Sequence, residues 1–257
     1  MIKFFRKIRQ NLLMENKTGK YLKYALGEIV LVVIGILIAL QINNWNQNRI
    51  NTEKQEGYLI GIRNDLEKQI ASFDTLNESN DLIINKGDSI LIDFNSIGKV
   101  SDIDSINRRL TFLMYTSFYP VISTTFNELN STGQLNLIKK RTLRSHVIEY
   151  YQNSENYQKL IDGNTENVVY NQLFPIIKSM VIIRQENFDF ENEKINFGNK
   201  LKTTFENNLN DPNKEFDLIN AISLRLIVAK SSKDRTNKAK KEAELLLDHI
   251  NNELNAN

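Results

Sequence analysis

The sequence contains no cysteine, two histidines, three prolines and ten glycines in 257 residues. Without cysteine, the chain has no disulfide framework, no thiolate zinc site and no cysteine nucleophile. Two histidines leave little material for a histidine-rich metal centre, and so few prolines and glycines argue against collagen-like or many-turned β architectures. Hydrophobic residues at 41% and charged residues at 25% are nevertheless typical of a globular protein.

Positive charge is concentrated at the N-terminus. Residues 1–23 contain seven Lys and Arg residues and one acid, whereas the remainder contains 26 basic and 30 acidic side chains. A nucleic-acid-binding protein would instead spread its cations over a folded face. The distribution therefore predicts a basic arm on a mildly acidic body, with no nucleic-acid partner.

One long apolar segment follows this arm. Leu22–Ile42 is interrupted only by Lys23, Glu28 and Gln41, and as a helix it would be roughly 31 Å long, which matches a hydrocarbon core of about 30 Å. A buried strand of this length would be unusual, since strands rarely exceed about ten residues. A cleavable signal peptide would need small residues at positions −3 and −1 of a cleavage site, and none follows the apolar run. We therefore predict an uncleaved transmembrane helix over residues 21–43.

The flanking charges predict the orientation of this helix. Seven cations precede it, whereas only Arg49 and Lys54 occur in the 15 residues after Ile42. The positive-inside rule then places residues 1–20 in the cytoplasm and residues 44–257 outside it, in a cytoplasmic (inner) membrane. Trp45 lies where an interfacial aromatic residue is expected.

The first residues predict a second membrane contact. Apolar residues recur at spacings of three and four from Ile2 to Leu12, which suits a short helix lying on the inner leaflet. Its other side would place four cations near anionic lipid headgroups: Lys3, Arg6, Lys7 and Arg9. The alternative is a disordered basic tail that only sets the topology.

Two features of the predicted span suggest more than anchoring. Gly27, Gly35 and Ala39 form a stripe of small residues that would let a second helix approach closely, so we expect a homo-oligomer. Glu28 lies within about 20° of Gly35 around a helix and shares that face. An acid inside a membrane is costly, and three interpretations stay open for it: helix assembly, proton or ion handling, or snorkelling to the headgroups.

Three segments within residues 1–46 carry a resemblance to a known family. They are Phe4-Phe-Arg-Lys-Ile-Arg9, Asn16-Lys-Thr-Gly-Lys-Tyr-Leu-Lys-Tyr-Ala-Leu-Gly-Glu28 and Ile34-Gly-Ile-Leu-Ile-Ala-Leu-Gln-Ile-Asn-Asn-Trp-Asn46. This block resembles the N-terminus of an uncharacterised, domain-of-unknown-function family of bacterial single-span membrane proteins. The resemblance implies a cytoplasmic-membrane protein with a helical extracytoplasmic region, and it implies no activity or catalytic residue.

The body of the chain has a mainly helical period. Apolar residues from Tyr58 to Leu76 step by three and four, while Asp65 and similar charged residues lie off that stripe. The fold predicted for the whole chain is mainly α, with one transmembrane helix and an all-α bundle. The expected helices cover a stalk (44–95), 102–116, 120–133, 139–162, 165–180 and a long C-terminal helix (214–254), with a short β or extended segment near 181–198.

Three details of these helices carry further expectations. Gly57 and Gly61 are candidate bends of the stalk, Gly163 would end the fourth helix, and Pro175 would kink the fifth. The end of the C-terminal helix has a coiled-coil-like seam, beginning at Ala243, that is too short to be stable alone. It should pack on the stalk or on a second copy.

No catalytic or cofactor-binding motif occurs in the sequence. His146 and His249 are isolated on predicted helices and are expected to be surface or core residues, and Asp102-x-Asp104 suits a helix N-cap better than a calcium loop. Lys139-Lys-Arg141 is expected to be solvated. The tyrosines of these helices, expected in the core or an interface with ligand stacking as an alternative, are Tyr150, Tyr151, Tyr157 and Tyr170.

Taken together, the sequence predicts a non-enzymatic, single-pass envelope protein that acts by protein–protein interaction or assembly. Its expected partners are the lipid bilayer and either a second copy or other envelope proteins, and no cofactor or metal is expected. The alternative is a membrane sensor or transport accessory that uses Glu28 for signalling or for proton or ion handling.

Overall fold

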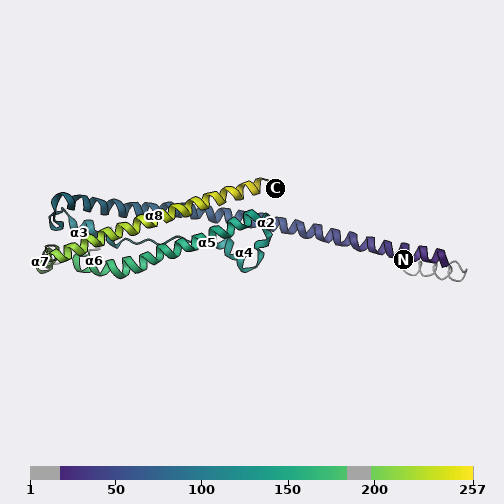
Figure 1. Cartoon of the computed structure of the whole chain (residues 1–257), viewed down its shortest axis with the longest axis horizontal. Helices are drawn as coiled ribbons and strands as arrows, with labels where there is room; N and C mark the ends of the chain where they lie inside the picture. Colours follow the sequence, from purple (N-terminus) through teal and green to yellow (C-terminus); the bar gives the residue numbers. More distant parts are fainter. Residues whose placement is uncertain (1–17, 184–197, 257) are drawn as a thin grey trace. The chain divides into compact units, whose positions relative to one another are not determined.

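A computed structural model of the chain describes residues 18–183 and 198–256. These ranges contain helices and connecting loops and no β-strand, which confirms the all-α class (Figure 1). The chain divides into two compact units, one ending at Gly57 and the other formed by Tyr58–Asn257.

The α-helices are α2 (Thr18–Ile97), α3 (Ile106–Arg109), α4 (Thr124–Ser131), α5 (Arg141–Asn164), α6 (Phe174–Met180), α7 (Gly198–Leu209) and α8 (Pro212–Asn255). Short helices of other types are η1 (Val100–Asp102), η2 (Leu110–Met114), η3 (Gln134–Leu137) and the π-helix η4 (Thr165–Leu173).

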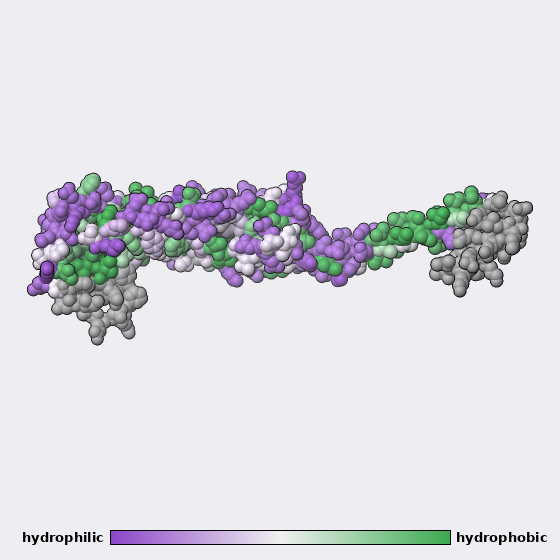
Figure 2. Space-filling view, turned by 90° about the horizontal axis from the view of Figure 1, so that it is seen from below, coloured by the Kyte–Doolittle hydropathy of each residue, from purple (hydrophilic) through white to green (hydrophobic). Residues whose placement is uncertain are grey.

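The N-terminal unit presents the apolar segment of the sequence on a helix. In α2, the apolar side chains from Leu22 to Ile42 are exposed; Leu31, for example, is 68% exposed. Figure 2 shows this part of α2 as a hydrophobic surface. The segment is long and apolar enough to cross a membrane, and none of it is buried against the rest of the protein.

The second unit is a bundle built on α2, α5 and α8 (Figure 1). Ion pairs join the two long helices: Lys230 to Asp88 at 3.3 Å, and Lys240 to Asp74. Since residue numbers rise along α8 as they fall along α2, the two helices are antiparallel. The C-terminal seam packs on α2, because Ala243 and Ile250 are buried in the same cluster as Leu59. This confirms the first of the two packings expected for that seam.

Apolar side chains of the bundle form two separate cores. The Phe73 core contains residues of α2, α5 and α8, chiefly Leu59, Ile62, Leu66, Phe73, Leu143, Val147, Tyr150, Leu246 and Ile250. The Phe112 core combines the far part of α2 with η2, η4, α6 and α8, chiefly Ile83, Ile90, Phe112, Leu113, Val169, Ile177, Ile222 and Ala229. The apolar period of α2 thus continues through both cores, as the sequence predicted for this face.

A polar layer lies between the two cores where α2 meets α8. We define it by Asn77, Asn80, Ser232, Thr236 and Asn237. Asn80 donates to the Ser232 hydroxyl at 3.2 Å, Asn77 donates to Asn237 at 2.9 Å, and Thr236 is completely buried. Thr236 donates to the Ser232 carbonyl at 2.9 Å, whereas the Asn77 side-chain oxygen is buried without a partner.

Buried polar side chains of α2 hold the loop between η2 and α4. Gln69, which is 1% exposed, donates to the Pro120 carbonyl and accepts from the Ile122 N–H, both at 2.6 Å. Asp65 accepts from the Thr125 N–H at 2.8 Å. The side chain of Asp65 thereby caps α4 from another helix, since the first backbone N–H groups of a helix lack partners within it. Asp65, which the sequence placed off the apolar stripe of α2, is nevertheless buried.

Several predicted boundaries were also wrong. Residues 102–116 form η1, α3 and η2 instead of one helix, because Ser105 takes a left-handed conformation with φ 51°. The segment from Pro120 to Ser123 is not helical, and α4 begins only at Thr124. Backbone groups of this segment bond to the Gln69 side chain instead of to a helical turn.

The helical connections differ from prediction as well. α2 stays helical through Gly57 and Gly61, and the chain continues past Gly163 from α5 into η4 and then α6. Just after Gly163 the chain changes from α5 to the π-helix η4, and the Asn167 side chain donates to the Gly163 carbonyl at 2.9 Å. Pro175 is the second residue of α6, directly after the π-helix η4. Most of the predicted β or extended segment lies outside the described residues, and helix α7 was not predicted.

Candidate functional site

The predicted assembly residues lie on an open face of α2. A Cβ added at Gly27 or Gly35 would meet no atom within 4 Å, and Ala39 is exposed. Trp45 is 66% exposed, and Glu28 is half-buried on the same helix. The small stripe is therefore free to receive a second helix. The cations predicted to contact lipid headgroups (Lys3, Arg6, Lys7 and Arg9) lie outside the described residues.

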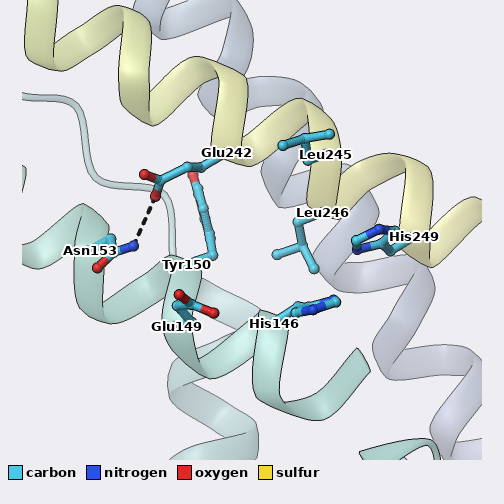
Figure 3. A pocket seen from close by; sticks show the side chains of 8 residues that line it. All are labelled: His146, Glu149, Tyr150, Asn153, Glu242, Leu245, Leu246 and His249. Atoms are coloured by element: carbon cyan, nitrogen blue, oxygen red, sulfur yellow. Dashed lines mark hydrogen bonds between the residues drawn. The ribbon is translucent and has the colours of Figure 1, made fainter. Parts of the chain in front are cut away.

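A pocket of about 270 Å³ lies between α5 and α8 in the bundle (Figure 3). Each helix contributes four side chains. They are His146, Glu149, Tyr150 and Asn153 from α5, and Glu242, Leu245, Leu246 and His249 from α8. Spacings of three, four and seven place these residues on the facing sides of the two helices.

Glu242 is held in this pocket by two hydrogen bonds from side chains of α5. Its Oε2 accepts from Asn153 Nδ2 at 3.1 Å, and its Oε1 accepts from the Tyr157 hydroxyl at 2.9 Å. Figure 3 shows the first of these bonds crossing from α5 to α8. Both donors are neutral, so they orient the carboxylate without neutralising its charge.

Tyr150 lies beside Glu242, and its hydroxyl group is unpaired. The residue is 4% exposed, and its hydroxyl has no hydrogen-bond partner. In Figure 3 its side chain reaches from α5 toward Glu242. The neighbouring Tyr119, in contrast, shares a 2.9 Å hydrogen bond with Ser154. A buried hydroxyl without a partner is unusual and calls for an explanation.

The two histidines of the sequence meet at the other end of the pocket. The rings of His146 and His249 stack with centroids 4.7 Å apart and planes 25° apart. Both are exposed, as expected of surface residues, but they are not isolated, because the pairing of α5 with α8 brings together residues far apart in the chain. In the part of the chain that the structure describes, no three His, Asp or Glu residues are placed to hold a metal ion.

Comparison with protein families gives one match. Residues 28–174 match a family of unknown function, DUF6090. The chain belongs to this family. No curated protein and no solved structure matches the chain.

The DUF6090 match and the pocket overlap only in part. The match begins at Glu28 and so includes residues 28–42 of the apolar segment, and it contains the α5 side of the pocket but not the α8 side. It also extends far into the body, where the resemblance read from the sequence, specific over residues 1–46, was diffuse. Membership of DUF6090 therefore supports an uncharacterised domain and brings no activity to the pocket.

The other residues noted in the sequence are buried, stacked or bonded to neighbouring side chains in this DUF6090 chain. Tyr150 and Tyr151 are buried, and the exposed ring of Phe118 stacks on Tyr170 with centroids 6.5 Å apart. Lys140, in the basic run, pairs with Glu253 at 3.0 Å. Asp102 accepts a hydrogen bond from Ser101 at 3.0 Å and caps no helix.

The tyrosines around the pocket predict a loss of stability at alkaline pH. Burial raises the pKa values of Tyr119, Tyr150 and Tyr151 above their usual range, and burial with the bond to Glu242 raises the pKa of Tyr157 to about 12. The unfolded chain releases these protons near pH 10 while the folded chain keeps them, so stability is complete below about pH 10 and is lost as the pH rises through the folded values. Thermal unfolding followed by circular dichroism should show a falling midpoint over this range.

Arg225 should have the opposite effect on stability as the pH rises in the same experiment. It is 3% exposed, donates to the Tyr115 carbonyl at 2.7 Å, and burial lowers its pKa to about 10. When Arg225 loses its proton at high pH, the cost of burying its charge disappears, and the folded chain becomes more stable. One such group opposes four tyrosines, so the net effect should still be a loss, and a Tyr150→Phe variant should lose less stability than the native chain. A midpoint that stays constant up to about pH 12 would contradict the argument.

Proposed function

We propose that the chain is a single-pass membrane protein whose helical domain works by binding other proteins or a second copy of itself. The domain would lie on the extracytoplasmic side of the cytoplasmic membrane. The observation that carries this proposal is the apolar segment Leu22–Ile42, which is helical and entirely unburied. A segment of about 20 apolar residues exposed to water would be costly, and a bilayer removes that cost. The basic residues before the segment support the orientation.

Carbonate extraction of cell membranes tests the anchoring. The native protein should stay in the membrane pellet. A Val33→Arg/Leu37→Arg variant should move to the supernatant, since each central arginine costs about 3 kcal/mol on insertion. An Ile92→Arg/Ile227→Arg variant is the matched control, because both side chains are exposed on the helical domain, and it should stay in the pellet. Native protein in the supernatant would refute the proposal, and protection of the C-terminus from protease in spheroplasts would refute the orientation.

A second candidate is a sensor or transport accessory, favoured by the place of Glu28 inside the apolar part of α2. Glu28 belongs to the matched family region, and it lies on the face of Gly35. A Glu28→Gln variant separates the two functions. Assembly, measured by cross-linking through a cysteine placed at Gly35, should survive this change, whereas any proton or ion flux should disappear.

A further inference from the structure

We propose that the pocket between α5 and α8 binds a primary alkylammonium group that carries an apolar body. The group would come from a free amine or from a lysine side chain of another protein. This inference stands apart from the membrane anchoring, because the eight lining residues all belong to the second unit.

The charge of the pocket favours a cation. Two of the eight lining residues, Glu149 and Glu242, are acids, and none is Lys or Arg. Within the described part of the chain, Glu242 is bonded by Asn153 and Tyr157, and no cation forms an ion pair with it. Glu242 is half-buried, so its charge is less screened than one at the surface. An ammonium ion supplies the missing positive charge and up to three N–H donors.

The Tyr150 hydroxyl gives a second, independent indication. It is buried, it lacks a partner, and it belongs to a residue that lines the pocket and reaches toward Glu242 (Figure 3). An ammonium bound to Glu242 can donate another of its hydrogens to the phenolic oxygen. The ligand would therefore satisfy the hydroxyl that the protein leaves unpaired, and this removes a desolvation cost.

The other end of the pocket suits an apolar body. Leu245 and Leu246 line it, and Leu245 is 51% exposed, so a ligand contact would cover apolar surface. The stacked rings of His146 and His249 add flat faces at the same end. A volume of about 270 Å³ accommodates a ligand of roughly ten heavy atoms.

Other ligand classes fit less well. An anion would meet two carboxylates and no cationic side chain in the lining. A transition metal needs three or four converging ligands, and the described residues offer no such group. A neutral apolar ligand would leave both Glu242 and Tyr150 as they are.

Calorimetric titration of the full chain in detergent tests the proposal with two probes. Phenethylammonium chloride represents a free amine, and Nα-acetyl-lysine amide represents a protein side chain. At least one should bind saturably, with a Kd on the order of 1 mM for ligands of this size. The tighter probe identifies the source of the amine. Phenethyl alcohol, which keeps the shape without the charge, should not bind.

Three variants locate the binding. Glu242→Gln should weaken it by on the order of tenfold, because a charge-assisted hydrogen bond is lost. Tyr150→Phe should also weaken it and should remain folded, since the hydroxyl has no partner in the free protein. Glu155→Gln is the control, because this acid pairs with Lys159 on the exposed side of α5 and should bind as the native chain does.

Two results would overturn the proposal. One is the absence of saturable binding for both amines in the native chain. The other is unchanged affinity in Tyr150→Phe, a variant whose folding the substitution leaves intact. Circular dichroism melting of each variant in the same detergent separates loss of binding from loss of structure.

Discussion

Replacing Phe73 by alanine should lower the free energy of unfolding by about 3–5 kcal/mol, the cost of removing a fully buried phenylalanine. Phe73 is completely buried in the Phe73 core, and its ring lies 5.2 Å from that of Tyr119. The deletion leaves a cavity surrounded by the three long helices. Because α2 and α8 continue into the Phe112 core and α5 is continued there by η4, the helices cannot collapse into the space without moving residues elsewhere, which favours the upper part of the range.

Urea unfolding of the full chain in detergent, followed by circular dichroism, measures this loss. Phe216→Ala provides the matched control, since Phe216 is 67% exposed on α8 and its removal should change stability by less than about 0.5 kcal/mol. A loss below about 1 kcal/mol for Phe73→Ala would show that the Phe73 core is not packed as described.

Replacing Gln69 by leucine should lower the free energy of unfolding by about 2–6 kcal/mol, although leucine is close to glutamine in size. The side chain of Gln69 pairs with both backbone groups of the loop, the Pro120 carbonyl and the Ile122 N–H. Leucine would leave both groups without partners in a buried site, and each orphaned group costs about 1–3 kcal/mol. The loss would come from the loop and the start of α4, not from the apolar core.

Hydrogen exchange tests where the Gln69→Leu effect arises. The Ile122 amide should exchange much faster in the variant, while amides in the Phe112 core keep their protection. Gln152→Leu serves as the control, because Gln152 is exposed on α5. Equal stability of the Gln69→Leu variant and the native chain would refute the role given to this amide.

The sequence predicts the long helices better than the connections between them. The apolar period of α2 and the Asp211-Pro212 start of α8 are local signals, and the structure follows them. Asp65 and Gln69 show why the rest could not be derived. Their partners lie 60 and 51 residues away, in a loop whose path no local period specifies.

The candidate site illustrates the same limit. Glu242 and the histidine pair acquire their surroundings from the alignment of α5 with α8, and nothing in either helix alone fixes that alignment. His146 and His249 are 103 positions apart in the sequence. The only available signal was the occurrence of both histidines, and of Glu149 and Glu242, on predicted helices. This signal identifies the side chains but does not predict that they lie close together.

The polar layer between the two cores has a consequence for how the long hairpin assembles. If α8 slid along α2 by one turn in the direction that brings Val228 to Asn80, Asn80 would face an apolar neighbour instead of Ser232, and Asp81 would lose Lys233. Each buried amide left unpaired in that way carries a penalty. Helices with uniformly apolar faces would tolerate such misaligned hairpins. The polar layer disfavours them during folding, much as a single asparagine fixes the alignment of a coiled coil.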